Sequence, residues 1–140
     1  MLVRMAIGVL AAVAIWAPAA GDYVLGWGDG IYYDYGAPHR LRFDVAEGPE
    51  GLVGEFHLSC GSIRSEFYAD RILSYNSVGG RASFVCVGWL NGEPGWLASV
   101  QIRDSGPEST APDWIQLAIC GSQEFETSGF LVRGDIVVNH

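Results

Sequence analysis

The sequence predicts an all-β fold, a single-domain antiparallel β-sandwich or barrel of about seven to eight strands. Three observations predict it. Runs in which apolar and polar residues alternate recur about every ten residues along the chain, and turns rich in Gly, Pro and Asn separate them. No stretch of useful length shows the 3.6-residue period of an amphipathic helix.

Residues 1–20 are expected to be a secretory signal peptide and not part of the fold. Arg4 supplies a positive charge, an apolar run follows, and Ala17-Pro18-Ala19 matches the small-residue cleavage pattern. An uncleaved anchor would need about 20 apolar residues, and this run is shorter and ends at a proline. Cleavage near Ala19 or Ala20 would leave residues 21–140 as one secreted or periplasmic domain without a transmembrane segment.

The first stretch of the mature chain, residues 21–38, is rich in glycine and aromatic residues. Two interpretations stay open. Clustered rings on a secreted β-protein can form a platform on which sugars stack, and they can equally seal one edge of the sheet structure. The candidate ligand-facing rings are Trp27, Tyr32, Tyr33 and Tyr35. The aspartates of this stretch lack the spacing of an EF-hand and are typical of turns, so no metal site is predicted.

Strands of the same two-residue period follow over residues 40–45 and 54–60, and the sequence Gly-Pro-Glu-Gly at 48–51 predicts the turn between them. Residues 63–75 alternate less clearly, which predicts one longer strand or two short ones.

The stretch from Ala82 to Asp104 predicts a β-hairpin and is the clearest structural signal in the chain. Asn91-Gly92 can adopt the positive φ angles of a tight turn, and Pro94-Gly95 adds a second joint. The positions expected to share the two inner faces are Ala82, Phe84, Cys86 and Gly88, and then Trp96, Ala98, Val100 and Ile102. Trp89 alternates with these residues and fits either face.

Two further strands complete the domain. After a polar loop rich in Gly, Ser and Pro, residues 113–120 place three apolar side chains on one face, those of Ile115, Leu117 and Ile119. Residues 129–138 predict the terminal strand, with a kink at Arg133-Gly134-Asp135. This tripeptide also spells an integrin-binding motif, but it leads directly into an apolar run and is interpreted as a structural turn.

Three cysteines remain after the signal peptide, and an oxidising compartment favours their pairing. Cys60 and Cys86 each share a face with apolar residues, so both are expected to point into the core from strands that could be neighbours. We therefore predict the disulfide Cys60–Cys86. Cys120 would then stay unpaired.

The composition excludes several classes of function. The chain has no lysine, and 16 acidic residues against eight arginines give a net charge of −8, which repels nucleic acid and anionic lipid. The three histidines are too scattered for a zinc site, and no G-x-S-x-G nucleophile motif occurs. We expect no cofactor, no nucleic-acid partner and no enzymatic activity.

The second half of the chain matches a longer pattern of strands and turns, A-x-F-x-G-x-G-x-x-N-G-x-P-G, a strand ending in Asp, then D-x-F-x-I-x-I and a closing strand. The matching positions are Ala82, Phe84, Gly88, Asn91, Gly92, Pro94, Gly95, Asp104, Asp113, Ile115, Leu117 and residues 134–140. Residues 82–140 thereby resemble a small module of secreted bacterial proteins, the post-COAP-type C-terminal domain. Cys86 and Trp114 depart from its pattern. The resemblance implies the fold and the compartment, and it carries over no site residue.

Together these features predict a secreted, non-catalytic β-domain of the bacterial envelope or exterior, structural or ligand-binding, with carbohydrate or protein as its candidate partner. The first alternative is an extracellular hydrolase of the glycosidase class, which would need a cleft with two carboxyl groups. The second is a protein-interaction module that uses an exposed sheet edge or the Cys120 thiol.

Overall fold

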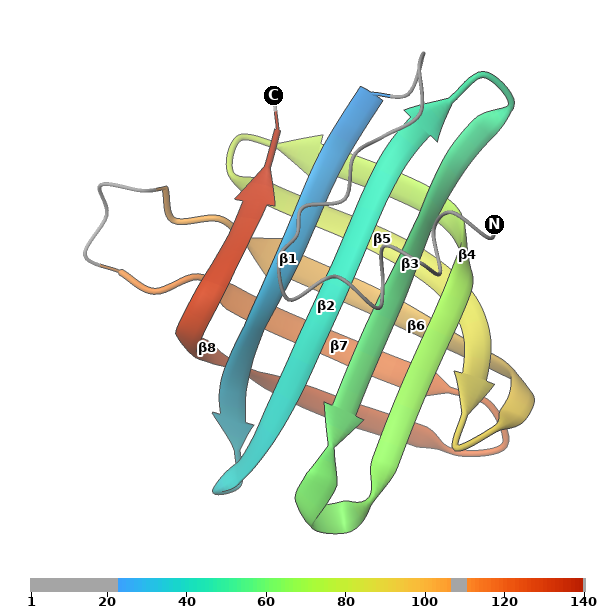
Figure 1. The fold of residues 1–140 in the computed structure, drawn as a ribbon, viewed down its shortest axis with the longest axis vertical. Helices are drawn as coiled ribbons and strands as arrows, with labels where there is room; N and C mark the ends of the chain where they lie inside the picture. The colour runs from blue at the N-terminus through green and yellow to red at the C-terminus, as the bar shows by residue number, and fades with distance from the viewer. Residues whose placement is uncertain (1–22, 107–110, 140) are drawn as a thin grey trace.

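The computed structural model describes residues 23–106 and 111–139, and within them eight antiparallel strands close into a barrel (Figure 1). Each strand pairs with its neighbours in the sequence, and β8 closes the barrel against β1. The elements are β1 (Tyr23–Asp34), β2 (Ala37–Gly48), β3 (Gly51–Cys60), the short 3-10 turn η1 (Gly61–Ile63), β4 (Ser65–Val78), β5 (Arg81–Leu90), β6 (Glu93–Arg103), β7 (Trp114–Cys120) and β8 (Glu124–Val138). The predicted all-β class is confirmed, and of the two predicted architectures the structure is the barrel.

The signal peptide expected over residues 1–20 lies outside the described residues. Among the residues that are described, no helix has the length and apolar character needed to cross a membrane.

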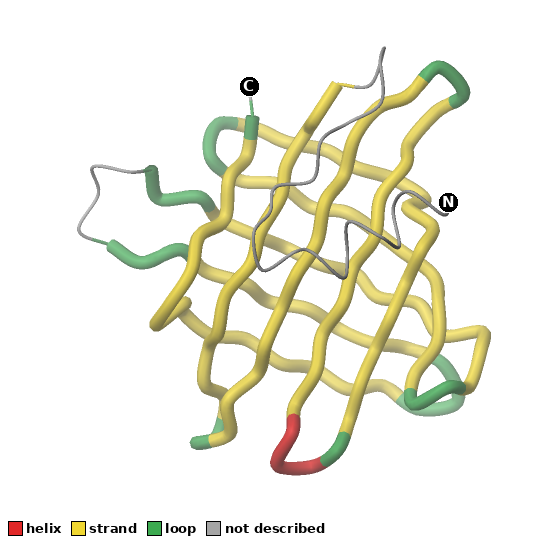
Figure 2. The backbone as a smooth tube through the Cα atoms, viewed as in Figure 1, coloured by secondary structure: helices red, strands yellow, loops and turns green. Residues whose placement is uncertain are grey.

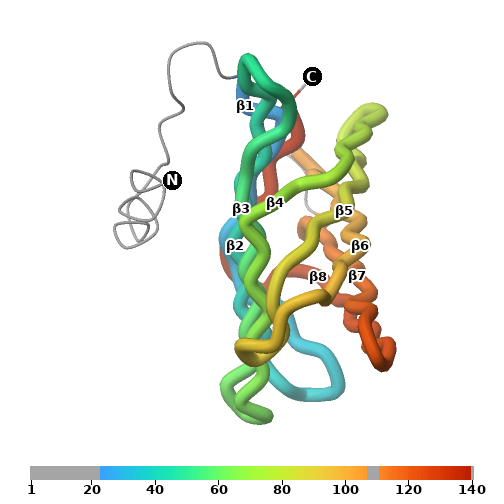
Figure 3. Tube along the Cα trace, turned by 90° about the vertical axis from the view of Figure 1, so that its right-hand side faces the viewer, coloured from blue at the N-terminus to red at the C-terminus, as the bar shows by residue number. Residues whose placement is uncertain are grey.

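The barrel is flattened into two layers of strands that cross at a steep angle. Figure 1 shows β1, β2, β3 and the first part of β4 in front, with β5, β6 and β7 behind them. The side view of Figure 3 shows these two layers edge-on, and Figure 2 places the turns at the ends of the strands. Layers that cross in this way need strands that pass from one layer to the other.

Strands β4 and β8 make these passages, and bulges bend them. The pairing of β4 with β5 shifts register twice, and the pairing of β1 with β8 shifts once beside Leu131. The tripeptide Arg133-Gly134-Asp135, the predicted position of a kink, lies within β8 directly after this register shift. Gly134 has a φ of +101°, and a Cβ atom there would collide with the backbone carbonyl of Asp29. Only glycine suits both conditions.

A further bulge sets the register of the predicted hairpin, β5 and β6. Asn91 and Gly92 have φ angles of 52° and 84°, as a tight two-residue turn requires. If the two strands continued from this turn without a break, the inward residue Ala82 would pair with an outward residue of β6. Gly95, with a φ of 90°, is left out of the pairing, so Ala82 faces Ile102 instead. The extra residue keeps the apolar faces of both strands inside the barrel.

Side chains from every strand fill the interior of the barrel. Phe43, Phe56, Phe67 and Phe84 form its centre, with ring centroids 5.3 to 6.3 Å apart. The eight positions expected on the inner faces of β5 and β6 are buried. No polar or charged residue of the described chain is buried, in keeping with the cost of burying polar groups. The interior is a packed core, so ligand sites are to be sought on the outer surface.

The predicted disulfide Cys60–Cys86 is wrong, since all three cysteines are free in the described residues. Both thiols point into the core as expected. However, Cys60 ends β3 and Cys86 lies in the middle of β5, and β4 runs between these two strands. A disulfide requires Cα atoms about 4.4 to 6.8 Å apart, whereas strands separated by a third strand lie about 9.5 Å apart.

Candidate functional site

The four aromatic residues predicted to face a ligand, three on β1 and Tyr35 in the turn after it, do not form one surface. Tyr32 is wrong as a ligand-facing ring, because it is 0% exposed and its hydroxyl is 3.1 Å from Thr127 Oγ1. Trp27, Tyr33 and Tyr35 are exposed. Tyr33 follows Trp27 by six positions on the same strand, which corresponds to about 20 Å, too far for a single sugar ring to contact both.

Trp27 instead borders a hollow of about 400 Å³ where β1, β2 and β8 meet. Charges of both signs line it, and they are partly neutralised by one another. Arg40 Nη2 lies 3.7 Å from Asp29 Oδ1, and Arg42 Nε lies 4.0 Å from Asp29 Oδ2. The RGD tripeptide also lines this hollow. Its arginine and aspartate therefore lie on the barrel wall and not at a loop tip.

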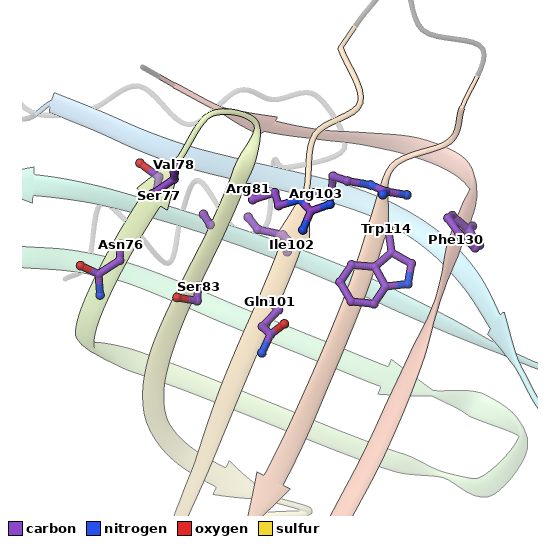
Figure 4. Close-up of a pocket in the computed structure, with 11 residues that line it drawn as sticks. Asn76, Ser77, Val78, Arg81, Ser83, Gln101, Ile102, Arg103, Trp114 and Phe130 are labelled. Carbon is purple, nitrogen blue, oxygen red and sulfur yellow. The ribbon is translucent and has the colours of Figure 1, made fainter.

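A larger groove, of about 510 Å³, runs across the outer surface at one end of the barrel (Figure 4). It is made of the end of β4, the start of β5, the end of β6 and single residues of β7 and β8. Eleven residues line it: Asn76, Ser77, Val78, Arg81, Ala82, Ser83, Gln101, Ile102, Arg103, Trp114 and Phe130.

Strand register places one row of large side chains across this groove. Val78 is paired with Arg81, Arg81 with Arg103, Arg103 with Trp114, and Trp114 with Phe130. Two arginines thus stand side by side between apolar groups. The indole ring of Trp114 is seen almost face-on in Figure 4, beside Gln101. Trp114 is half-buried, and the part of its ring that borders the groove is suited to stacking against the C–H face of a sugar.

A second row, two residues further along each strand, carries uncharged hydrogen-bonding groups. Asn76 is paired with Ser83, Ser83 with Gln101, and Gln101 with Gln116. All four residues are exposed. Amides and hydroxyls can both donate and accept hydrogen bonds, so this row can serve the hydroxyl groups of a sugar without a net charge.

No Asp or Glu is among the residues that line the groove. The two nearest in sequence, Asp104 and Asp113, turn toward backbone N–H groups. Asp104 accepts hydrogen bonds from Gly106 N at 2.8 Å and from Val138 N at 3.0 Å. Asp113 accepts from Ser105 N at 2.8 Å and from Ile136 N at 2.7 Å. These carboxylates join residues 104–106 and 113 to β8, and the groove keeps a positive charge in an acidic protein.

Asp135 lies beside these two aspartates, and its pKa is raised. Partial burial, a hydrogen bond with Asp113 and the negative charges of Asp113 and Asp104 raise its pKa to about 6, against a smaller opposing effect of the Ile136 N–H. The Asp113 and Asp135 carboxyl groups are hydrogen-bonded to each other. Glycosidases hold theirs about 5 Å or more apart, with the sugar between them.

A third cluster lies on the outer face of β3, β4 and β5. Tyr68 stacks on Trp89 with ring centroids 6.0 Å apart, and its hydroxyl donates to Glu55 Oε1 at 2.9 Å. His57 Nε2 is 2.9 Å from Glu66 Oε2. Trp89, which fitted either face by sequence, points outward and is 38% exposed. These side chains hydrogen-bond and stack on one another, and they line neither hollow.

The Cys120 thiol lies near the opposite end of the barrel from the groove, 3.8 Å from Glu124 Oε1. Desolvation, followed by the negative charges of Glu124 and Glu126, raises its pKa. A raised pKa lowers the fraction of thiolate, which is the nucleophilic form. His57 is hydrogen-bonded to Glu66 and His39 to the Ala37 carbonyl, whereas the Cys120 thiol contacts Glu124.

The chain matches no family model, no curated protein and no solved structure. Among the groove residues, sequence reasoning named Ala82 and Ile102 as inner-face positions and Trp114 as a departure from a pattern, and it assigned none of them to a ligand site. The turn at Gly79-Gly80 sets Arg81 opposite Val78, and this part of the groove could have been found from the sequence. The pairing of Arg81 with Arg103 depends in addition on the bulge at Gly95, which shifts the register after the Asn91-Gly92 turn.

Proposed function

We propose that this protein is a secreted, non-catalytic module that binds a glycan in the groove across β4 to β8. One observation carries the proposal: Trp114 and a row of uncharged amides and hydroxyls lie together on an open, carboxylate-free surface. Aromatic faces contact the apolar faces of sugars, and a few well-placed polar groups fix orientation. The groove is open, as binding to an extended chain requires.

The arrangement favours binding over the hydrolase alternative. A glycosidase of the common kind needs two carboxyl groups on either side of the scissile bond, and the lining of this groove contains none. The protein-interaction alternative required an exposed sheet edge, and the described strands leave none because they close into a barrel. The Cys120 thiol remains as a surface group, and its raised pKa makes it a poor nucleophile.

The proposal is tested by isothermal titration calorimetry of the mature protein against a panel of neutral and acidic oligosaccharides. We expect at least one oligosaccharide to bind, and Trp114→Ala to abolish the binding. Trp89→Ala is the matched control, because it removes an exposed indole from the same sheet outside the groove. Thermal unfolding without ligand establishes that both variants fold. Binding that survives Trp114→Ala, or a panel without any binding, would refute the proposal.

A further inference from the structure

We infer that the groove selects an acidic glycan and that Arg81 and Arg103 together bind the carboxylate of a uronic acid residue in a polysaccharide. This inference rests on the proposed glycan binding and specifies the class of sugar. It is carried by the way the two guanidinium groups are held.

The two arginines form a direct cross-strand pair of like charges. Arg81 on β5 is opposite Arg103 on β6, and residues so placed have Cβ atoms about 5 Å apart. Like charges directly opposite each other destabilise a sheet. In the part of the chain that the structure describes, no carboxylate lies within ion-pair distance of either guanidinium. The fold thus tolerates a repulsion that a bound anion would relieve.

The surroundings of Arg103 hold its guanidinium in place for an anion. Its Cζ atom lies 5.9 Å from the centroid of the Phe130 ring, a cation–π contact that draws the group across β7. Its Nε is shielded from solvent and makes no hydrogen bond with the described residues. Partial removal of water strengthens the attraction between the guanidinium and an anion. Its fork of N–H groups matches the two oxygens of a carboxylate.

The rest of the groove and the charge of the chain favour a sugar carboxylate over other anions. The net charge of −8 repels a dense polyanion such as nucleic acid. Salt limits this repulsion to about 8 Å at physiological ionic strength, so a single carboxylate close to both arginines is attracted. Trp114 and the amide row provide the contacts for the uncharged remainder of the sugar.

The test is calorimetric titration with trimers of galacturonate, glucuronate, mannuronate and guluronate, each compared with its methyl ester. Esterification removes the charge and keeps the sugar. We expect at least one acid form to bind ten times or more tighter than its ester, and a rise from 0.05 to 0.5 M NaCl to weaken the acid form only. We expect Arg81→Gln and Arg103→Gln to remove the preference. Arg103→Lys should keep part of it, because lysine retains the charge without the fork.

Arg71→Gln is the matched control, since Arg71 is exposed on β4 outside the groove, and we expect it to leave the preference intact. Equal binding of acid and ester, lost in Trp114→Ala, would overturn the acidic class and leave glycan binding standing. An acid preference that persists in both Gln variants would overturn the assignment to the two arginines. No binding of any of these trimers would overturn the inference, and the wider neutral panel would then decide the proposed function separately.

Discussion

Replacing Arg81 with Gln should stabilise the ligand-free protein, because it removes one member of a like-charged pair. Arg81 and Arg103 are directly opposed on β5 and β6, and neither has a carboxylate partner among the described residues. Two unit charges about 6 to 10 Å apart, the range open to two long side chains on directly opposed positions, repel by about 0.4 to 0.7 kcal/mol at the dielectric constant of water. For a domain of this size, a gain of that order raises the melting temperature by about 3 °C.

Thermal unfolding followed by circular dichroism measures this gain, at 10 mM and at 500 mM NaCl. We expect the melting temperature of Arg81→Gln to exceed that of the wild type at low salt, and the difference to shrink at high salt, where the screening length is about 4 Å. Arg71→Gln should show no comparable gain. A melting temperature that is equal or lower at 10 mM NaCl would refute the electrostatic reasoning, and so would a gain that salt leaves unchanged.

Three further predictions concern the fold. Gly88→Ala should destabilise the protein by about 3 kcal/mol or more, because the new Cβ atom would collide with the Tyr68 carbonyl. Urea unfolding measures this loss. Gly61→Ala is the neutral control, because a Cβ atom at Gly61 would have no neighbouring atom within 4 Å. Asp135 has a raised pKa of about 6 in the folded state, so the stability it contributes is fully present below pH 4 and is lost as the pH rises through 6. Asp135→Asn should reduce this decrease in the free energy of unfolding by about 1 kcal/mol, after allowance for exposure to solvent. Unfolding measured from pH 4 to pH 8 checks this. Alkylation without reductant should modify three thiols in the unfolded chain, as counted by mass spectrometry. In the folded chain Cys86 should stay unmodified, because burial raises its pKa to about 12.

The arginine pair of the groove is expected to lower the stability of the unbound barrel and to favour binding of an acidic sugar. An arginine pair without acidic partners costs free energy in the unbound state and provides the charge that an acidic sugar would need. Variants of the pair should therefore change the two properties in opposite directions. Arg81→Gln is expected to raise the melting temperature and to lower the affinity for the acid trimer, which separates a binding role from a merely structural one.

The sequence by itself determined the strand class and most of the inward faces. Period-two alternation identified the apolar face of β5, from Ala82 to Gly88, and the face of β6 that begins at Trp96, and these residues are buried. The turn at Asn91-Gly92 was readable because few residues tolerate positive φ at both positions. These properties depend on neighbours a few residues apart along the chain, so a single sequence contains them.

Only the tertiary structure decided which faces and strands meet. Alternation did not place Tyr32 in the core, because aromatic residues occur on both faces of a strand, and the closure of β1 against β8 buries it. The pairing of Cys60 with Cys86 required a strand order that the sequence does not state, and β4 separates the two. The groove joins residues from Asn76 to Phe130 through the registers of five strands. Register follows from bulges and from closure of the barrel, which are properties of the whole sheet and not of any one strand.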